Sequence, residues 1–595
     1  VLPCAELCAE PVAELTQLTQ NANRFVREDA AKELLKYGDP RVPPVILALL
    51  KNDPAKEVRI GLIYSLYGYN SPVDAVFVPV LVDLLQNDPE KDIRSSAAYV
   101  LGSSADARVI PHLAATSRTG EKNIRTMSLY ALGNLAKAGI TSPEGYDTVS
   151  AALSDKTDPS VRASAATALA QFSDPRAVDL LIGALETETP GMRVSVIPSL
   201  VPYAAKGIGK DKITDALIKV VGDPSPSTRE KAAWALGEIK DPKAVSALNP
   251  LLSDRFTKVR VAASAALKKL NVPAGQVIEV PPAPELAIPA LLAQAEDADP
   301  TMRSDAITEL KFFKNARATA AIVAGLQDKE MYVRFTAVYA LAGYGAANDP
   351  ASLEPLKKLL EDKDLRSMAL SSIGYIDDPR VKELMLSYAK DSAAASELRS
   401  TALQYIGEKG DPSMMPIFSA CFVLEDKELA KQAIRSAGKL AEKMQDKGAL
   451  ADALIPRLSD DSGRVRAVTA EILFRLNQPK TAGAYQKGLS DPFTDVRKFS
   501  AQAVGYFGQE GAASAVFALL KDQDQSVQSY AKDTLAELGM SPDSIAQGIP
   551  AAGDYVMELT EKVKTADEWS RDESAEKLGK MNIPRAKEAV LDLAR

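Results

Sequence analysis

The sequence predicts an all-α fold, a right-handed α-solenoid of about 17 stacked helical hairpins, from three observations. A valine-arginine pair followed by alanines and a glycine returns about every 31 to 37 residues. An Asp-Pro turn precedes many of these runs, and a stretch with helical apolar spacing precedes the turn. Hydrophobic residues make up 46% of the 595 residues but aromatic ones only 6%, which is typical of small-residue helix packing. A unit of this length buries its apolar face only by stacking on its neighbours.

The first helix of a unit is clearest at residues 174–185. Val178, Leu181 and Leu185 are spaced by three and four residues, as one face of a helix requires. Asp223-Pro224 exemplifies the turn that follows, because aspartate can cap a helix and proline suits its first turn.

The second helix contains the arginine and the alanines, as in residues 226–239. A glycine eight residues after the arginine is predicted to end this helix in the left-handed conformation. The glycines at this position are Gly102, Gly133, Gly237, Gly374, Gly407 and Gly505.

The spacing of the arginine position predicts a duplicated block. This position falls at residues 27, 59, 94, 125, 162, 193, 229, 260, 303, 334, 366, 399, 430, 466, 497, 528 and 571. Ala430 and Gln528 replace the arginine, and we expect weaker stacking there. The intervals from 260 to 303 and from 528 to 571 are both 43 residues. The predicted parts are a first block of eight repeats with an N-terminal segment (1–270), a Pro-rich junction (271–287), a second block of eight (288–540), and a junction with the start of a further repeat (541–595).

The two ends of the sequence carry further expectations. Residues 585–594 resemble a first helix with no second helix after it, so we expect the native chain to continue past Arg595 or a partner to cover this end. The start at Val1 indicates processing or truncation, which gives a lean towards an exported, periplasmic protein in a location otherwise unknown.

Composition and charge limit the classes of partner that the chain is expected to bind. A formal net charge of -8 argues against nucleic-acid binding, whose affinity comes largely from basic side chains on phosphates. The sequence contains no run of 18 apolar residues, so it predicts no membrane-spanning helix. Cys4 and Cys8 are predicted to form a local disulfide outside the cytosol or two free thiols inside it.

No residue pattern predicts catalysis. His112 is the single histidine and follows Pro111 at the expected start of a helix, so we interpret it as structural. Cys4 and Cys8 offer only two thiolates, whereas zinc needs three or four converging ligands. We therefore predict a noncatalytic protein with no catalytic residues, no metal and no cofactor.

The run Asp-Pro followed by Val-Arg-x-x-Ala-Ala-x-Ala-Leu-Gly resembles HEAT repeats of the short type common in prokaryotic, bacterial proteins and in phycobilin-lyase-like proteins. The resemblance covers residues 12 to 594. It implies that the arginines are structural and form a hydrogen-bonded ladder with turn aspartates, pairing Arg162 with Asp158, Arg229 with Asp223 and Arg497 with Asp491. The ladder arginines are Arg59, Arg94, Arg125, Arg162, Arg229, Arg260, Arg334, Arg466 and Arg497.

The resemblance also implies that second helices line a concave face. Positions one and five after the arginine vary freely and share one exposed stripe of each second helix. Aromatic residues recur there, and such residues anchor protein interfaces. The candidate protein-binding residues are Tyr64, Tyr99, Tyr130, Trp234, Phe335 and Tyr339, joined by Ile60 and Val261. The alternative is that these rings fill gaps between neighbouring second helices.

The predicted function is a noncatalytic scaffold for protein-protein interaction, with self-association through the solenoid ends as one form of it. The alternative is an accessory chaperone or lyase-like protein that handles a bilin-type chromophore or its acceptor protein.

Overall fold

The computed structural model describes most of the chain. The described residues are 9–69, 73–155, 158–187, 189–272, 288–313, 316–343, 352–507, 516–537 and 563. Cys4, Cys8, most of the predicted junction at 271–287 and nearly all of the predicted segment 541–595 lie outside them.

The contacts between residues divide the chain into two compact units. Unit 1 combines residues Val1–Ile46 with Glu383–Arg595, and unit 2 is Leu47–Lys382. This division follows packing, whereas the predicted eight-repeat blocks follow the spacing of the arginines, so the blocks remain a prediction.

The α-helices of unit 2 are α5 (Lys56–Tyr69), α6 (Val78–Asn87), α7 (Lys91–Leu101), α8 (Ile110–Thr119), α9 (Lys122–Lys137), α10 (Pro143–Leu153), α11 (Pro159–Leu169), α12 (Arg176–Thr187), α13 (Pro190–Ala205), α14 (Lys210–Val220), α15 (Pro226–Ile239), α16 (Val245–Leu248), α17 (Thr257–Lys269), α18 (Ile288–Gln294), α19 (Pro300–Leu310), α20 (Ala316–Gly325), α21 (Met331–Gly343), α22 (Leu353–Lys358) and α23 (Arg366–Ile373). Those of unit 1 are α2 (Ala9–Leu18), α3 (Arg24–Leu34), α25 (Ser396–Lys409), α26 (Met415–Ser419), α27 (Lys427–Ala441), α28 (Gly448–Leu454), α29 (Gly463–Leu476), α30 (Thr494–Phe507) and α32 (Gln525–Glu537). The boundary between the units falls inside α4 (Val42–Asn52) and α24 (Pro379–Lys390).

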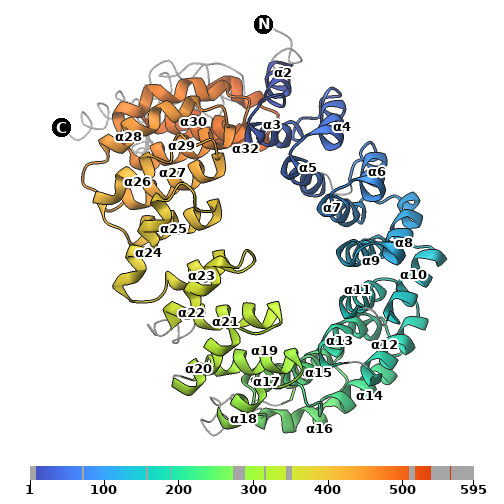
Figure 1. The fold of residues 1–595 in the computed structure, drawn as a ribbon. Helices are drawn as coiled ribbons and strands as arrows, with labels where there is room; N and C mark the ends of the chain where they lie inside the picture. The colour runs from blue at the N-terminus through green and yellow to red at the C-terminus, as the bar shows by residue number, and fades with distance from the viewer. Residues whose placement is uncertain are drawn as a thin grey trace. The chain divides into compact units, whose positions relative to one another are not determined.

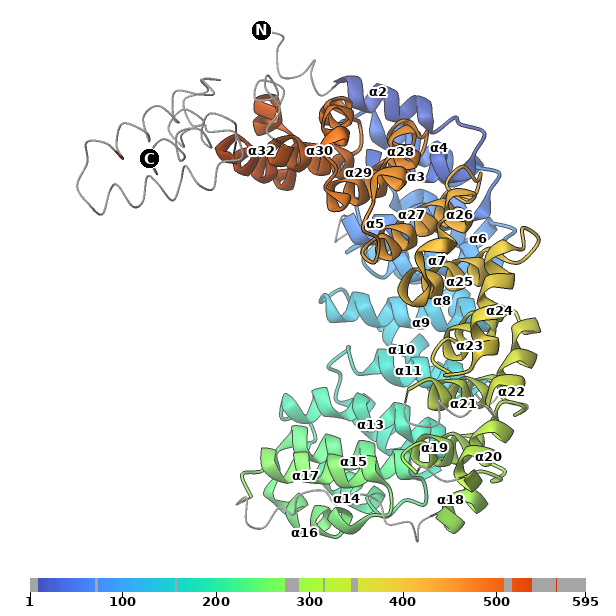
Figure 2. The same cartoon turned by 90° about the vertical axis from the view of Figure 1, so that its left-hand side faces the viewer.

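Consecutive helices form hairpins that stack side by side, which confirms the predicted all-α solenoid. In unit 2 the second helices α7, α9, α11 and α13 form one row and the first helices α6, α8, α10 and α12 form another (Figure 1). Figure 2 shows the stacked hairpins after a quarter turn. The apolar positions around each arginine are core: Val161, Ala165 and Leu169 are all fully buried.

In some of the turns a side-chain oxygen caps the second helix, as at α11 and α15. Asp158 accepts from the Ser160 amide, and Pro159 begins α11, as predicted from Asp-Pro. The turn before α15 differs, because Ser225 caps the helix and Asp223 instead accepts from the Ser225 amide.

The repeated glycines have a different role from the one predicted. Gly102 has φ -62, and Gly237 lies within α15, so neither needs a left-handed backbone. A Cβ at Gly102 would lie 2.7 Å from Cα of Ala131, and one at Gly237 would lie 2.7 Å from Cα of Ala266. These glycines therefore let neighbouring second helices approach closely. The left-handed residues occur three positions later, at Ala105 and Lys240.

An arginine-aspartate ladder crosses from repeat to repeat. Arg229 donates from Nε and Nη2 to both carboxylate oxygens of Asp254, at 2.7 and 2.9 Å, and from Nη1 to the main-chain carbonyl of Asp223. The carbonyl of Asp254 in turn accepts from Arg260. One aspartate thus joins two successive arginines. The same 25-residue register joins Arg303 to Asp328, Arg466 to Asp491 and Arg497 to Asp522.

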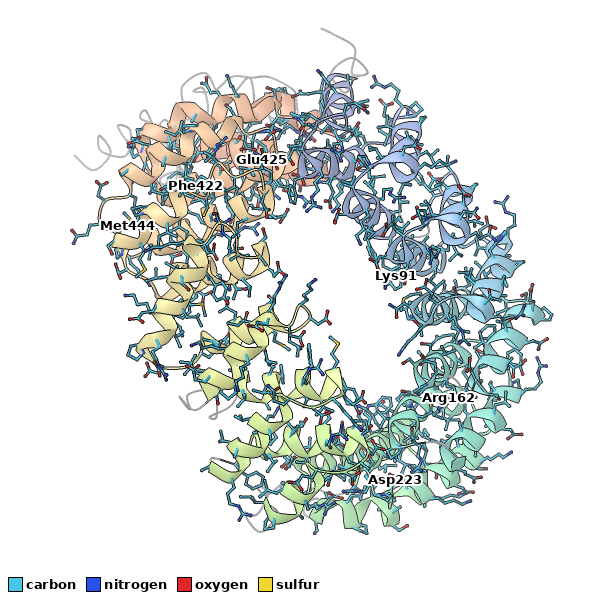
Figure 3. The ribbon with its side chains drawn as sticks, in the orientation of Figure 1. Lys91, Arg162, Asp223, Phe422, Glu425 and Met444 are labelled. Atoms are coloured by element: carbon cyan, nitrogen blue, oxygen red, sulfur yellow. The ribbon has the colours of Figure 1, made fainter. Side chains whose placement is uncertain are left out.

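The carboxylate that pairs with each of these arginines therefore lies in the turn of the next repeat, one repeat beyond the turn that the resemblance implied. Arg229 meets Asp223, and Arg497 meets Asp491, only through main-chain carbonyls. Arg162 donates to the carbonyl of Asp155, while Asp158 caps its helix and pairs with Lys122. Figure 3 labels Arg162 and Asp223 in unit 2. The other predicted ladder arginines make equivalent contacts: Arg59 with Asp88, Arg94 with the Asp88 carbonyl, Arg125 with Asp155, and Arg334 with the Asp328 carbonyl.

Other side chains replace the two missing arginines. Gln528 donates from Nε2 to the carbonyl of Asp522, as a ladder arginine would. At Ala430 the ladder contact comes from Lys427, whose Nζ lies 3.0 Å from Asp460 and 2.9 Å from Asp461 of the next repeat. Both departures therefore keep a polar link between neighbouring repeats.

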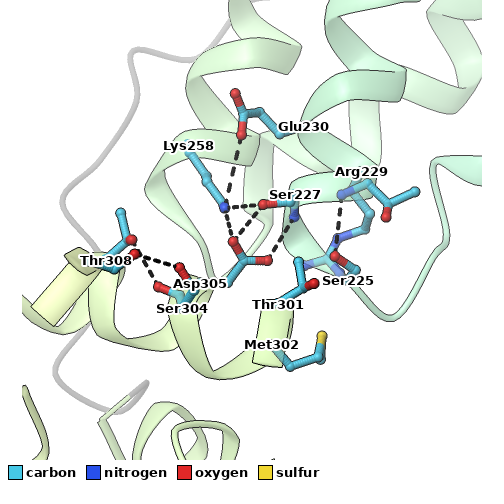
Figure 4. Close-up of polar contacts among 12 residues, drawn as sticks. Ser225, Ser227, Arg229, Glu230, Lys258, Thr301, Met302, Ser304, Asp305 and Thr308 are labelled. Carbon is cyan, nitrogen blue, oxygen red and sulfur yellow. Dashed lines mark hydrogen bonds and ion pairs between the residues drawn. The ribbon is translucent and has the colours of Figure 1, made fainter. Parts of the chain in front are cut away.

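In unit 2, α19 docks on the N-terminal ends of α15 and α17 through two carboxylates. Asp305 accepts from the amide and hydroxyl of Ser227 and pairs with Lys258, as the dashed lines of Figure 4 show. Glu309, one turn later, accepts from the amide and hydroxyl of Thr257 at 2.9 and 2.6 Å. Because the first amides of a helix lack intrahelical acceptors, carboxylates are favourable there.

We call this contact of two carboxylates on one helix with the starts of two other helices a dock. Unit 1 contains a second dock, whose carboxylates stand at the same positions after the ladder arginine. Asp29 of α3 accepts from Ser462 at 2.6 Å and lies 2.8 Å from Nε of Arg464, at the start of α29. Glu33 accepts from the amide of Thr494, the first residue of α30, at 2.7 Å. Thr494 and Thr257 both stand three residues before their ladder arginine, so helices distant in sequence meet by the same chemistry.

Candidate protein-binding surface

Three tyrosines of the predicted strip, Tyr64, Tyr99 and Tyr130, come from three successive second helices, and Tyr67, which was not predicted, joins them. We call Tyr64, Tyr67, Tyr99 and Tyr130 the tyrosine cluster. The rings of Tyr99 and Tyr130 are stacked, with centroids 5.4 Å apart and an interplanar angle of 7°. Tyr64 and Tyr67 lie 5.9 and 5.4 Å from Tyr99. Tyr99 is half-buried between its neighbours, and burial is the main cause that raises its pKa above the ordinary value.

The tyrosine cluster combines ring packing with exposure. Tyr64 remains 47% exposed and Tyr130 37% exposed, although both contact Tyr99. The geometry thus contains elements of both interpretations made from the sequence. Tyr99 fills a seam between helices, while Tyr64 and Tyr130 present large apolar area to solvent.

Trp234 and Val261 line a groove further along unit 2. This groove, of about 530 Å³, has an apolar wall formed by Pro198, Trp234, Val261, Ala262, Ala265 and Phe312, and we call it the aromatic groove. Trp234, Val261 and Phe312 are 37%, 51% and 50% exposed and come from α15, α17 and the residues after α19. Such exposed apolar area is typical of interaction sites on soluble proteins.

Phe335 and Tyr339 extend the apolar surface onto α21. Both are exposed. The ammonium of Lys311 lies 5.1 Å from the ring centre of Phe312 and 5.4 Å from that of Tyr339, so one cation faces both rings. The six predicted residues therefore fall into two groups, with Tyr64, Tyr99 and Tyr130 in one and Trp234, Phe335 and Tyr339 in the other.

The dock of α19 fixes one wall of the aromatic groove. Thr257, Lys258 and Glu309 belong both to the groove rim and to the dock. Thr257 bonds to Glu309, and Lys258 pairs with Asp305, so these polar groups of the rim already have partners, while Trp234 and Phe312 remain exposed. This arrangement can bind an apolar side chain by burial and stacking.

Sequence reasoning missed Tyr67 and Phe312. They stand eight and nine residues after their ladder arginines, one turn beyond the predicted stripe positions. Extending the stripe by three or four residues would have found both.

The described residues hold no group of three or more His, Cys, Asp or Glu side chains placed to bind a metal ion. His112 lies in α8 with Nδ1 3.0 Å from Nε2 of Gln86. Cys421 is a buried free thiol. In the part of the chain that the structure describes, no helix has the length and apolarity needed to cross a membrane.

A model of HEAT repeats matches residues 5–67, 146–206, 202–268 and 288–364. These segments carry HEAT repeats. The matched segments cover less than half of the chain, and the hairpins between and after them continue the same stacking. No curated protein matches the chain by sequence.

Several solved structures are similar in fold. The karyopherin Kap121p bound to the SUMO protease Ulp1p is 14% identical, over 98% of this chain and 80% of that one, with a TM-score of 0.39. Kap95p, solved with RanGDP, is 13% identical over 98% and 96% of the two chains, with a TM-score of 0.38. An engineered protein is 21% identical over 33% of this chain and 96% of its own, with a TM-score of 0.26. All three TM-scores lie below 0.5.

Proposed function

We propose that this HEAT-repeat protein is a noncatalytic scaffold that binds a partner protein through the aromatic groove. The observation that carries the proposal is the exposure of Trp234, Val261 and Phe312 around one groove of about 530 Å³. Tryptophan is enriched among residues that dominate binding energy, and such anchors act best in pockets that exclude water. A segment with a bulky apolar side chain fits this groove.

The tyrosine cluster supplies a second contact area in the same proposal. Tyr64 and Tyr130 offer apolar faces with a hydroxyl at the edge, a combination that interfaces favour. The cluster and the groove both belong to unit 2.

The test begins with native purification under gentle conditions and mass spectrometry of any protein that stays bound in stoichiometric amount. The Trp234→Ala/Phe312→Ala variant should then lose at least about tenfold in affinity for that protein, because hot-spot aromatics typically contribute 2 kcal/mol or more. Tyr375→Ala/Val423→Ala removes similarly exposed apolar area outside the groove and is the matched control. Equal binding by the two variants, with unchanged thermal stability, contradicts the proposal.

Two narrower roles stay predictions. Self-association would appear as concentration-dependent mass in solution. A role in handling a bilin-type chromophore or its acceptor protein would give natively purified material visible absorbance.

A further inference from the structure

Unit 1 contains a second groove whose chemistry differs from that of the aromatic groove. It lies between α27 and α29, has a volume of about 400 Å³, and we call it the basic groove. Its lining residues are Arg435, Gly438, Lys439, Glu442, Lys447, Glu471, Ile472, Arg475 and Leu476.

The apolar part of the groove's lining, which we call the floor, contains a glycine. A Cβ at Gly438 would lie 2.8 Å from Cδ1 and 2.9 Å from Cγ2 of Ile472, so the glycine leaves room for the Ile472 side chain. Ile472 and Leu476 complete the floor.

The walls carry more positive than negative charge, in a chain whose formal net charge is -8. Four basic side chains, Arg435, Lys439, Lys447 and Arg475, face two acidic ones, Glu442 and Glu471.

Both carboxylates already have partners. Lys439 lies 2.8 Å from Glu442, and Arg475 lies 2.8 Å from Glu471. Lys439 is the main cause that lowers the pKa of Glu442, and Arg475 and Lys447 lower it further. Arg435 is exposed and makes no hydrogen bond or ion pair with any residue that the structure describes.

We propose that the basic groove is a binding site for an acidic peptide segment of a partner protein. Arg435 would pair with one carboxylate of the segment, and its fork of donors suits bidentate contact. An aliphatic side chain of the segment would lie over Gly438 and Ile472. A nucleic acid fits less well, because the floor offers no polar group for a continuous phosphate backbone and Glu442 is exposed at the rim.

The site is independent of the proposed function, since the two grooves belong to different units and share no residue. Loss of the aromatic groove would leave acidic-peptide binding intact. The two proposals can therefore fail separately.

The experiment is fluorescence anisotropy of the full chain with a short labelled peptide of alternating glutamate and leucine. The Arg435→Glu/Arg475→Glu variant should bind at least about tenfold more weakly than wild type, as expected when charged anchors are reversed. Lys487→Glu/Lys521→Glu, at exposed lysines outside the groove in the same unit, makes the same change in net charge and should bind like wild type. Arg435→Gln alone should weaken binding without lowering the melting temperature, which separates a binding defect from a folding defect.

Two results would overturn the proposal. One is equal loss of binding by the groove variant and the lysine control, which would mean attraction to overall charge. The other is tight, Arg435-dependent binding of a labelled single-stranded oligonucleotide with no binding of the acidic peptide.

Discussion

Individual glycines and alanines set the distance between second helices. Gly102, Gly133, Gly237 and Gly407 each face the backbone of the next second helix, where a Cβ would lie within 3.0 Å of a main-chain atom. Repeat spacing locates such glycines, but it does not distinguish close approach from a left-handed helix end. That distinction depends on the neighbouring helix, which is a tertiary feature.

Gly237→Ala should destabilise the protein by about 1 to 3 kcal/mol, because the new methyl group meets Cα of Ala266. Gly183, in α12, has no atom within 4 Å of the corresponding Cβ position. Gly183→Ala should stabilise by about 0.5 to 1 kcal/mol through helix propensity. Denaturant unfolding of both variants checks this, and a stable Gly237→Ala protein would contradict the packing explanation.

Asp29 gives the dock in unit 1 a defined dependence on pH. Burial raises the pKa of this carboxyl to about 6, although Arg464 and Ser462 both lower it. A folded-state pKa raised above the ordinary value of 3.8 means that the docked form binds the proton more tightly. The resulting stabilisation is complete below about pH 4 and is lost as the pH rises through about 6.

Docking of α3 should therefore be stronger at pH 5 than at pH 7, with up to about 3 kcal/mol available across the full window. Asp29→Asn removes the titrating proton and should abolish this dependence. Hydrogen exchange of the α3 amides at both pH values measures it. Stronger docking at the higher pH would contradict the dominance of burial over the Arg464 pair.

The ladder acts at the scale of whole elements, since arginines such as Arg229, Arg466 and Arg497 tie the start of one second helix to the turn before the next. Arg466 and Asp491 are both nearly buried, and both oxygens of the carboxylate are engaged at 2.7 Å. The motif in the sequence identifies the arginines, but the turn aspartate nearest in sequence is not the carboxylate partner. The right partner is the one brought close by stacking.

Arg466→Met should destabilise unit 1 by about 3 to 5 kcal/mol, because Asp491 would be left buried and unpaired. Arg108→Met is the control, since Arg108 is 81% exposed and contacts Asp106 in its own turn. Its melting temperature should match that of wild type. A similar loss in the two variants would show that the ladder contributes no more than a surface pair.

The tyrosine cluster should separate into packing and binding roles. Tyr99→Ser should lower the melting temperature, because this half-buried ring contacts three others. Tyr64→Ser/Tyr130→Ser should leave the melting temperature nearly unchanged and weaken partner binding, since both of these rings are exposed. Loss of stability in the double variant would favour gap filling for the whole cluster.

At the scale of the whole molecule, periodicity alone was enough to predict an all-α solenoid, because every hairpin obeys the same local rules. The two docks could not be predicted in this way. Their signal is an acidic pair two and six residues after the ladder arginine, which among the repeats occurs only at Asp29/Glu33 and Asp305/Glu309. These repeats are the first of the two predicted blocks, yet a carboxylate pair on one helix does not reveal which distant helix ends it will cap.

The dock on α30 can be tested through a single amide. The Thr494 N–H donates to Glu33, so Glu33→Ala should accelerate hydrogen exchange at the start of α30. Glu309→Ala should do the same for Thr257 at the start of α17. Glu28→Ala, on the same helix as Glu33, should leave Thr494 exchange unchanged. Unaltered exchange in Glu33→Ala would mean that the bond does not protect this amide.

The dock between α3 and α29 can form only after a long stretch of the chain between these helices has been synthesised. Asp29 leaves the ribosome 433 residues before Ser462, the side chain to which it bonds. At typical elongation rates of about 5 to 20 residues per second, the hairpin of α2 and α3 waits roughly 20 to 90 s for its partner surface. During that interval Asp29 and Glu33 are hydrated and charged, so the nascent hairpin presents two carboxylates to solvent, and its contacts with α29 and α30 form only after those helices have been synthesised.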